Sequence, residues 1–221
     1  MYDQYCVIFD MDGVLANTGS IHFESWVKLA NEIGKNFTKD FFANTFGQTS
    51  PDIIKKLVGS DLNSERIKKW AKLKEKYYRE MVKDKLKLLP GVLDLINSLK
   101  LKKFKLAVGS SGPIANIDLL LDVLNIKSVF DCIVSGDDVK SGKPAPDIFL
   151  SVSKKLNIDP KNCIVIEDAP VGITAAKRAE MKTIALTTTH KESELLNADL
   201  IIKDLSDIDI NNIIQLLDMS K

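Results

Sequence analysis

The sequence predicts an α/β protein in which a doubly wound parallel sheet carries an inserted helical subdomain. Three observations support this fold class. Six short apolar runs are spaced along the chain, helical patterns lie between most of them, and one long stretch after the first run shows helical patterns alone. The chain has 221 residues, 45% hydrophobic and 28% charged, so it can bury a large core.

The six apolar runs have the length and composition of strands. Their hydrophobicity is continuous rather than alternating, which is typical of strands buried on both faces of a parallel sheet. The predicted strands are Tyr5–Phe9, Lys105–Gly109, Cys132–Val134, Cys163–Ile166, Thr183–Leu186 and Leu200–Ile202.

Helical patterns connect these strands, with apolar side chains recurring on one stripe. Pro113, Pro146 and Pro170 stand where three of the helices would begin, as proline prefers. Strand and helix in repeated alternation indicate a Rossmann-like core. The predicted helices cover residues 91–101, 113–124, 146–156 and 170–179.

The stretch from about residue 17 to 87 breaks this rhythm. It shows helical patterns over 23–30, 52–57 and 67–78, with a turn-rich segment over 46–52. We therefore expect an α/β core domain formed by residues 1–16 and 88–221, and an α-helical cap subdomain formed by residues 17–87.

Charge is divided unevenly between these parts. The formal net charge of +1 gives no general reason to expect nucleic acid as a partner. Residues 16–88 contain 15 Lys or Arg and 9 Asp or Glu, whereas the remainder is net acidic. Positive potential in the insert would draw in an anionic substrate. The alternative is a solvated helix face formed by Lys68, Lys69, Lys72, Lys74 and Lys76.

The sequence predicts no membrane segment and no signal peptide. No apolar run approaches the roughly 20 residues that span a bilayer. The first apolar run lacks a basic flank and is followed by Asp10 and Asp12. Cys6, Cys132 and Cys163 are odd in number and far apart, so we expect free buried thiols and a cytoplasmic location.

Polar clusters lie where the predicted strands end or the following helices begin. In open α/β sheets, ligands bind at the carboxyl ends of the strands, so we expect these clusters to converge on one rim. They are Asp10–Asp12, Gly109–Gly112, Gly142–Lys143 and Glu167–Asp168.

The residue types in these clusters suit a metal ion beside a phosphoryl group. Carboxylates crowded together would repel one another unless a cation lay among them, and oxygen-only ligands beside phosphate favour Mg²⁺. Lys143 and the Ser110 hydroxyl would supply a positive charge and a hydrogen-bond donor to a phosphoryl group. Each cluster taken singly is also common in turns and helix caps, so the combination carries the prediction.

The four clusters resemble the motifs of the haloacid dehalogenase-like hydrolase superfamily. The resemblance covers essentially the whole chain and places the insert where that superfamily has a cap. The segments 18–26, 143–149 and 167–173 resemble its β-phosphoglucomutase-like branch. In chain order, the four motifs correspond to Phe9–Val14, Ser110, Lys143 and Glu167–Asp168.

The resemblance implies a role for each of these residues. Asp10 would be the nucleophile that forms an aspartyl phosphate. Asp12 would be the general acid and then the general base. Mg²⁺ would be held by Asp10, Asp12 through its backbone carbonyl, Glu167 and Asp168. The phosphoryl oxygens would be bound by Ser110, Ser111 and Lys143.

The same residues separate phosphoryl transfer from other chemistries of the superfamily. True dehalogenases need no acid for a halide and no Mg²⁺, so Asp12 and the Glu167–Asp168 pair favour phosphoryl transfer. Phosphonate cleavage would require a cap lysine that forms a Schiff base, and no motif places one.

Two phosphoryl-transfer activities remain open, a phosphatase and a β-phosphoglucomutase-like hexose-phosphate mutase. Pro51 stands where the mutases carry an arginine for a second phosphate. Tyr78, Arg79 or Glu80 falls near the family's cap lysine. His22 matches the mutase-like hinge region, although it could also be a helix-surface residue. The missing arginine favours hydrolysis.

The cap turn is expected to choose the substrate. Gly47, Gln48, Thr49 and Ser50 offer neutral hydrogen bonds, and with His22 they would bind the hydroxyls of a small phosphorylated sugar or polyol. The sequence therefore predicts a Mg²⁺-dependent phosphatase that acts on a small phosphorylated metabolite and binds neither nucleic acid nor membranes. The resemblance implies that it is a monomer.

Overall fold

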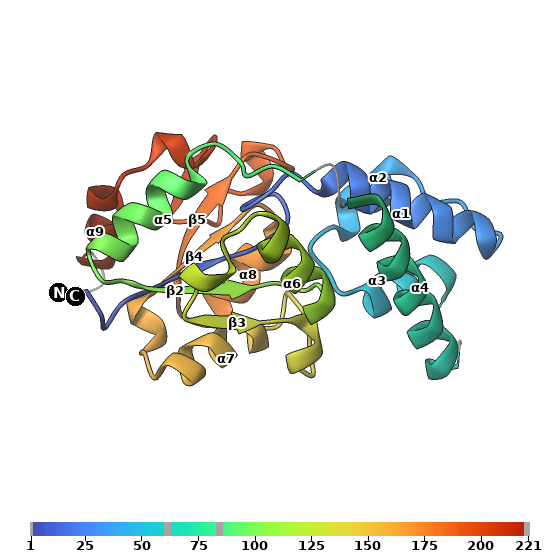
Figure 1. Ribbon diagram of the computed structural model, residues 1–221. Helices are drawn as coiled ribbons and strands as arrows, with labels where there is room; N and C mark the ends of the chain where they lie inside the picture. The colour runs from blue at the N-terminus through green and yellow to red at the C-terminus, as the bar shows by residue number, and fades with distance from the viewer. Residues whose placement is uncertain (1, 60–62, 83–85, 219–221) are drawn as a thin grey trace.

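The core of the protein is a six-stranded parallel sheet, as Figure 1 shows. The structure is a computed structural model that describes residues 2–59, 63–82 and 86–218. Each predicted strand is confirmed to within one residue at either end. The strands are β1 (Cys6–Phe9), β2 (Lys105–Gly109), β3 (Cys132–Val134), β4 (Cys163–Glu167), β5 (Lys182–Leu186) and β6 (Leu200–Ile202).

The strand order β3-β2-β1-β4-β5-β6 places β1 in the interior of the sheet, paired in parallel with β2 and β4. The chain runs from β1 outward to one edge, and then from β4 outward to the other. The order therefore reverses beside β1, and such a reversal opens a crevice at the carboxyl ends of the strands. Asp10 directly follows β1 at this point.

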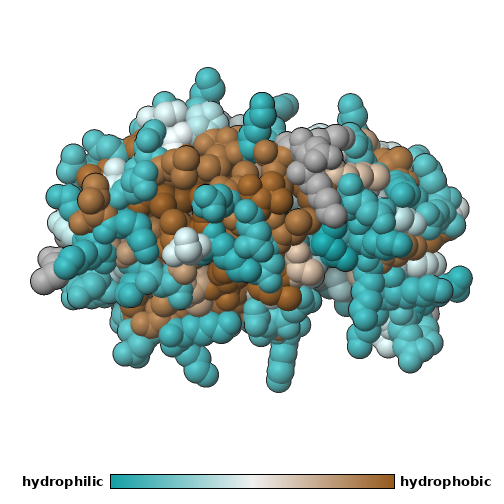
Figure 2. Space-filling view, in the orientation of Figure 1, coloured by the Kyte–Doolittle hydropathy of each residue, from teal (hydrophilic) through white to brown (hydrophobic). Residues whose placement is uncertain are grey.

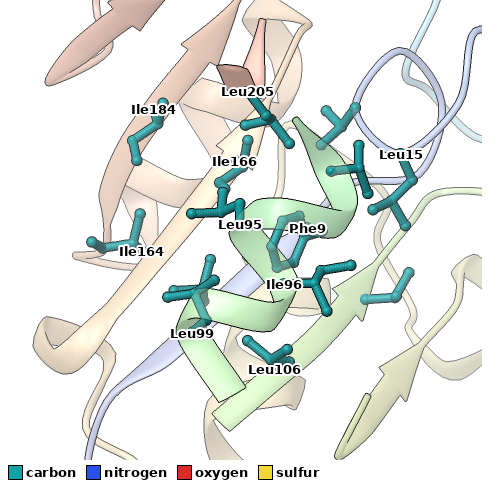
Figure 3. Packing of buried hydrophobic residues seen from close by; sticks show 14 of the residues in the cluster. Phe9, Leu15, Leu95, Ile96, Leu99, Leu106, Ile164, Ile166, Ile184 and Leu205 are labelled. Atoms are coloured by element: carbon teal, nitrogen blue, oxygen red, sulfur yellow. The ribbon is translucent and has the colours of Figure 1, made fainter. Parts of the chain in front are cut away.

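Both faces of the sheet are buried because successive strand residues point to opposite sides. Val7 and Phe9 face the cluster beneath α5, α6 and α9, whereas Cys6 and Ile8 face the cluster beneath α7 and α8. Figure 3 shows Leu95 of α5 lying close to Phe9 of β1. The five helices are α5 (Val92–Leu101), α6 (Ile114–Val123), α7 (Asp147–Leu156), α8 (Pro170–Arg178) and α9 (Ile210–Asp218).

The four predicted core helices are present, and the prolines lie at their starts. Pro113 and Pro146 are N-cap residues, and Pro170 is the first residue of its helix. Helix α9 is an addition to the prediction. The doubly wound α/β fold class is therefore confirmed.

In the described part of the chain, four helices form the cap, at the end of the core where the carboxyl ends of the strands lie (Figure 1). They have their own core, in which Trp26 stacks on Phe37 with ring centroids 5.4 Å apart. The sequence did not predict α2, and the predicted turn over 46–52 is too long because α3 begins at Ser50. The helices are α1 (Gly19–Glu32), α2 (Lys39–Thr45), α3 (Ser50–Val58) and α4 (Ser64–Val82).

The two connections between cap and core run side by side. Ala16 forms an antiparallel bridge with Leu88, and the backbone N–H of Leu89 donates to the carbonyl of Leu15 at 3.0 Å. The proposed boundaries of the cap, residues 17 and 87, flank this pair. Residues 60–62 and 83–85 of the proposed cap lie outside the described residues.

The basic face of α4 is only partly solvated. Lys68, Lys69, Lys72 and Lys76 are exposed, but Lys74 is 2% exposed, so its assignment to a solvated face is wrong. Figure 2 shows a largely hydrophilic cap surface, with apolar surface gathered over the core around α5 and α6.

Two further expectations concern membranes and cysteines. Within the described residues, no helix has both the length and the apolar character needed to cross a bilayer. All three cysteines are free and buried, as predicted.

Candidate active site

A cavity of about 40 Å³ lies between the cap and the carboxyl ends of the strands. Most of the residues predicted to form a site line its wall. Lys143 and Glu167 lie behind that wall, and Thr49 lines a neighbouring cavity instead. The predicted residues on the wall are Asp10, Asp12, His22, Gly47, Gln48, Ser50, Ser110, Ser111 and Asp168.

Lys143 joins the first and fourth polar clusters. Its ammonium donates to Asp10 Oδ1 and to Glu167 Oε1, both at 2.6 Å, and to the carbonyl of Gly109 at 3.1 Å. Burial alone would lower the pKa of Lys143, but the two carboxylates outweigh it and raise the pKa above its ordinary value. Lys143 is therefore a fixed positive charge directly behind Asp10.

Three buried carboxylates are suited to hold a divalent cation. Asp10, Glu167 and Asp168 each offer an oxygen within 4.8 Å of the others. Burial, with added repulsion from Glu167 and Asp12, raises the pKa of Asp10 to about 7 even though Lys143 opposes the shift. Burial raises the pKa of Asp168, and repulsion from the carboxylates of Glu167 and Asp10 raises it further. Hard oxygen ligands under such repulsion fit Mg²⁺.

Glu167 is held by the backbone as well as by Lys143. Its Oε2 accepts hydrogen bonds from the backbone N–H groups of Asp168, at 2.9 Å, and Ala169, at 3.0 Å. A Cβ on Gly172 would come within 1.8 Å of Glu167 Oε1. The glycine in the first turn of α8 therefore leaves the space that this carboxylate fills.

Asp168 is oriented by a loop that the sequence did not single out. The hydroxyl of Thr189, which follows β5, hydrogen-bonds to Asp168 Oδ2. In the same loop, Thr188 Oγ1 donates to the carbonyl of Gly13 at 2.6 Å. The carboxyl end of β5 was the available signal, because hydroxyl-bearing residues follow it as polar residues follow β1, β2 and β4.

Asp12 points away from the three-carboxylate group and toward the cap. Its Oδ1 lies 3.1 Å from His22 Nε2 and accepts a hydrogen bond from Thr18. Burial pushes the pKa of Asp12 upward. The interactions with His22, Thr18 and Lys74 outweigh that effect and hold the pKa below its ordinary value. His22 is thus a buried contact of Asp12 rather than a helix-surface residue.

Lys74 reaches this pair from α4. Its Nζ lies 2.7 Å from His22 Nδ1 and 3.1 Å from Glu75 Oε1. An ammonium can only donate, so Nδ1 of His22 is the acceptor and Nε2–H is the donor to Asp12. Lys74 lies one turn before Tyr78, the first of the positions that the resemblance gave for a cap lysine. Its charge made a surface location the simpler prediction.

The second cluster forms a compact turn at the start of α6. The Ser110 hydroxyl is buried and accepts from the backbone N–H of Gly112 at 3.1 Å. Within the described part of the chain, the buried hydroxyl of Ser111 has no hydrogen-bond partner. Both serines line the cavity, so both hydroxyls are placed to meet a bound ligand.

The cap turn divides into two environments. Gly47 and Gln48 line the small cavity, whereas Thr49 hydrogen-bonds to Asp52 at 2.6 Å in a larger cavity of about 770 Å³. Ser50 lines both cavities, together with Glu75 and Ser111, and its hydroxyl hydrogen-bonds to Glu75. A polar wall therefore separates the small cavity from a wider vestibule.

Comparison of this sequence with known proteins shows the family to which the chain belongs. The model of the haloacid dehalogenase-like hydrolases matches residues 7–186. A phosphorylated carbohydrates phosphatase of Thermotoga maritima is 35% identical, over 80% of this chain and 82% of its own length. A beta-phosphoglucomutase of Bacillus subtilis is 32% identical, over 91% of this chain and 90% of its own.

A solved structure gives the same family relationship. The crystal structure of a beta-phosphoglucomutase from Clostridium difficile superposes with a TM-score of 0.88. It is 28% identical in sequence, and the similarity covers 97% of both chains.

Proposed function

Since the chain belongs to the haloacid dehalogenase-like hydrolase family, we propose that it is a phosphatase that cleaves a small phosphorylated sugar or polyol. The observation that carries the proposal is the position of Asp10. Its carboxylate lines the small cavity, with Lys143 at 2.6 Å behind it, while Ser110 and Ser111 line the same cavity. Once ionised, a carboxylate oxygen that faces a phosphoryl site with positive charge and hydroxyl donors around it suits nucleophilic attack on phosphorus.

The reaction begins when an Asp10 oxygen attacks the phosphorus. The bond from phosphorus to the substrate oxygen breaks, and Asp10 becomes an aspartyl phosphate. Lys143 stabilises the charge on the nucleophile and the equatorial oxygens, and Ser110 and Ser111 donate to those oxygens. One such electrostatic contact commonly contributes about 10²–10³ in rate.

Asp12 serves the leaving oxygen and then the water. Since Asp12 is ionised in the structure, it must first take up a proton, which it then gives to the departing alkoxide. The carboxylate that this leaves takes a proton from the water that attacks the aspartyl phosphate. Positioned proton transfer contributes about 10²–10⁴ in rate. The hydrogen bonds from His22 and Thr18 fix the orientation of the Asp12 carboxyl for both steps.

Asp10, Asp168 and Glu167 would hold Mg²⁺, with Glu167 acting directly or through water, and the backbone carbonyl of Asp12 would complete the protein ligands. When bound, Mg²⁺ supplies positive charge that offsets the phosphoryl charge and the repulsion among the carboxylates. Glu167 has a second task, because it holds Lys143.

The size of the cavity bears on how the substrate binds. About 40 Å³ holds roughly three waters, which is space for a phosphoryl group but not for a sugar as well. The cap must therefore move for the leaving group to enter and for the product to leave. Gln48 and Ser50, on the cap side, would contact the hydroxyls of the leaving group.

A hexose-phosphate mutase is the second candidate, because beta-phosphoglucomutases are among the relatives. A mutase must bind a second phosphate group while the bisphosphate intermediate reorients in the site. Pro51 lines the vestibule rather than the small cavity. Among described residues, Lys74 is the one lysine or arginine on the wall of the small cavity, and its ammonium already contacts Glu75 and His22. This arrangement favours hydrolysis.

One assay separates these candidates. Purified protein with Mg²⁺ is incubated with a panel of sugar and polyol monophosphates, sugar bisphosphates, nucleotides and phosphoproteins, and free phosphate and isomerised sugar phosphate are both measured. We expect phosphate from the sugar or polyol monophosphates, and none from Asp10→Asn. Isomerised product with little phosphate would establish the mutase, and activity on nucleotides or phosphoproteins alone would reject the substrate class.

The remaining proposals concern the setting of the enzyme. We propose a monomer in the cytoplasm whose partner is its small substrate, without nucleic acid or membrane. Gel filtration with light scattering tests the monomer directly.

A further inference from the structure

A continuous line of hydrogen bonds runs from the core helix α6, through the cap, and back to Asp12. It starts at Asn116 in the first turn of α6 and passes to Glu75, Lys74 and His22. It ends at the contact between His22 and Asp12. The line crosses between core and cap twice, first between α6 and α4 and then between α1 and the segment after β1.

Asn116 occupies the point where α4 meets α6. Its Oδ1 accepts from Arg79 Nη1 at 2.8 Å, and its Nδ2 donates to Glu75 Oε2 at 2.5 Å. A guanidinium can only donate and an ionised carboxylate can only accept, so these partners fix the orientation of the amide. Asn116 is 1% exposed, and Glu75 is 6% exposed.

The polar contact is supported by an apolar one beside it. Leu119, one turn further along α6, packs against a cap cluster that contains Tyr78 and Val82 of α4. Together these contacts hold α4 against α6 of the core, in addition to the paired connections at Ala16 and Leu88. They therefore exist only while the cap is docked.

Glu75 connects Asn116 of the core to Lys74 of the cap. One of its oxygens accepts from Ser50 and Lys74, and the other accepts from Asn116. Without the amide, that second oxygen would lose its partner in a buried site, and the carboxylate would turn to find another. Lys74 would then lose the alignment that makes His22 Nδ1 an acceptor and its Nε2–H a donor to Asp12.

We propose that Asn116 is a positioning residue that clamps the docked cap to the core and, through Glu75, Lys74 and His22, aligns Asp12 for proton transfer. The clamp is independent of the chemistry. The alignment of Asp12 rests on the proposed function, because it concerns the proton given to the leaving oxygen.

The clamp is tested without substrate. Hydrogen exchange of the backbone amides of α4 is measured by mass spectrometry in the wild type and in Asn116→Ala, with Glu80→Gln as the matched control. Glu80 is on the same helix, and its side chain is 51% exposed. We expect the backbone amides of α4 to exchange faster in Asn116→Ala than in the wild type. In the control we expect them to exchange at the wild-type rate. Equal exchange in all three proteins would overturn the clamp.

The alignment is tested by the dependence on leaving group. An alkoxide needs a proton to depart, whereas p-nitrophenolate does not, and kcat/KM reports the steps up to its departure. For Asn116→Ala we expect kcat/KM to fall about 10–100-fold on a sugar or polyol phosphate and less than about 3-fold on p-nitrophenyl phosphate. An equal loss on both substrates, or no loss, would overturn the alignment.

A pair of exchanged polar groups provides the rescue. Asn116→Asp alone sets two carboxylates against each other, and we expect the same selective loss. When Glu75→Gln is added, the new amide at position 75 can donate to the new carboxylate at position 116, so the hydrogen bond is restored in the opposite direction. We expect the double variant to recover most of the lost kcat/KM. A double variant no better than Asn116→Asp would contradict the proposal. If the wild type released phosphate from no substrate, the proposed function and the alignment would both fail, and the exchange measurement would still decide the clamp.

Discussion

Gly172 shows how closely the packing around Glu167 is set. A Cβ there would lie 1.8 Å from Glu167 Oε1, the oxygen that Lys143 contacts at 2.6 Å. Real atoms do not approach so closely, so a side chain at this position must displace the carboxylate. The displacement would reach Lys143 and, through it, Asp10.

We therefore predict that Gly172→Ala lowers kcat/KM at least about 10-fold, because one misplaced electrostatic contact costs at least that much. Gly19→Ala is the matched control, since a Cβ on Gly19 meets nothing within 4 Å. Steady-state kinetics with thermal melting of both variants checks the prediction. Equal activity of the two variants would show that Glu167 adjusts without loss.

The site residues differ in how far the sequence could predict them. Asp10, Ser110 and Asp168 follow strands directly, so the end of an apolar run places them on the wall of the cavity. Lys74 gave no such signal, because a lysine that lies among other lysines on an amphipathic helix is predicted to be exposed to solvent. Its burial depends on Glu75 and His22, and that three-residue contact joins two helices far apart in the sequence.

Individual elements were predictable when a periodic pattern was long enough. The buried strands stood out because apolar residues continue across both faces. Helix α2 has seven residues, with Phe41 and Phe42 adjacent, which leaves no helical stripe. Helix α9 follows a segment in which Asp and Ile alternate, and that alternation obscures its start.

The cap folds around its own apolar core, so a substitution in one cap helix tests how much that core contributes to the stability of the protein. Leu29 of α1 is fully buried in that cluster. We predict that Leu29→Ala destabilises the protein by about 2–5 kcal/mol, through lost burial and the cavity left behind. The control is Leu101→Ala at the end of α5, where the side chain is 84% exposed and the change should be within about 0.5 kcal/mol. Denaturant unfolding provides the comparison.

The edge of the sheet beyond β5 depends on the carboxylate of Asp199. Its Oδ2 accepts from the backbone N–H and the hydroxyl of Thr183, at 2.7 and 2.8 Å, and from Lys177 at 2.6 Å. Burial raises the pKa of Asp199, but these donors outweigh it and hold the pKa below its ordinary value. The group therefore stabilises the fold when ionised.

A depressed pKa in the folded state gives stability at neutral pH that is lost as the pH falls through that value. We predict that Asp199→Asn lowers the unfolding free energy by about 1 kcal/mol at pH 7, because charged hydrogen bonds are lost. The difference from the wild type should begin to shrink below about pH 4, the ordinary pKa of an Asp carboxyl in the unfolded chain, and shrink further as the folded carboxyl becomes protonated at lower pH. Unfolding free energies at pH 7, 5 and 3 test it, and a constant difference would contradict the role of ionisation.

At the scale of the whole molecule, the reversal of strand order beside β1 brings the chemistry together. The segments after β1, β2 and β4 meet on one rim, and the cap closes over them from the side of the paired connections. The sequence predicted this convergence, since it follows from parallel strands. The position of α4 against α6 could not be predicted, because it depends on Asn116, Glu75 and Arg79 meeting across the two parts.

Closure also divides the space between cap and core. In the proposed function the small cavity would hold the phosphoryl group. The vestibule of about 770 Å³ shares Ser50, Glu75 and Ser111 with it. We therefore expect substrate entry to require motion of the cap relative to the core, with the connections near Ala16 and Leu88 as the place where the two parts are joined. The reacting groups of the core need not move, because Lys143 fixes Asp10 and Glu167 from behind.

The most direct measurement is to look for phosphate on Asp10 during turnover. Protein with Mg²⁺ and a sugar or polyol phosphate is quenched in acid, reduced with borohydride and digested, so that an acyl phosphate becomes a homoserine in the peptide. We predict homoserine at position 10 in the wild type and none in Asp10→Asn. If phosphate is released while Asp10 stays unmodified, and Asp10→Asn turns over as fast as the wild type, attack by this carboxylate is refuted.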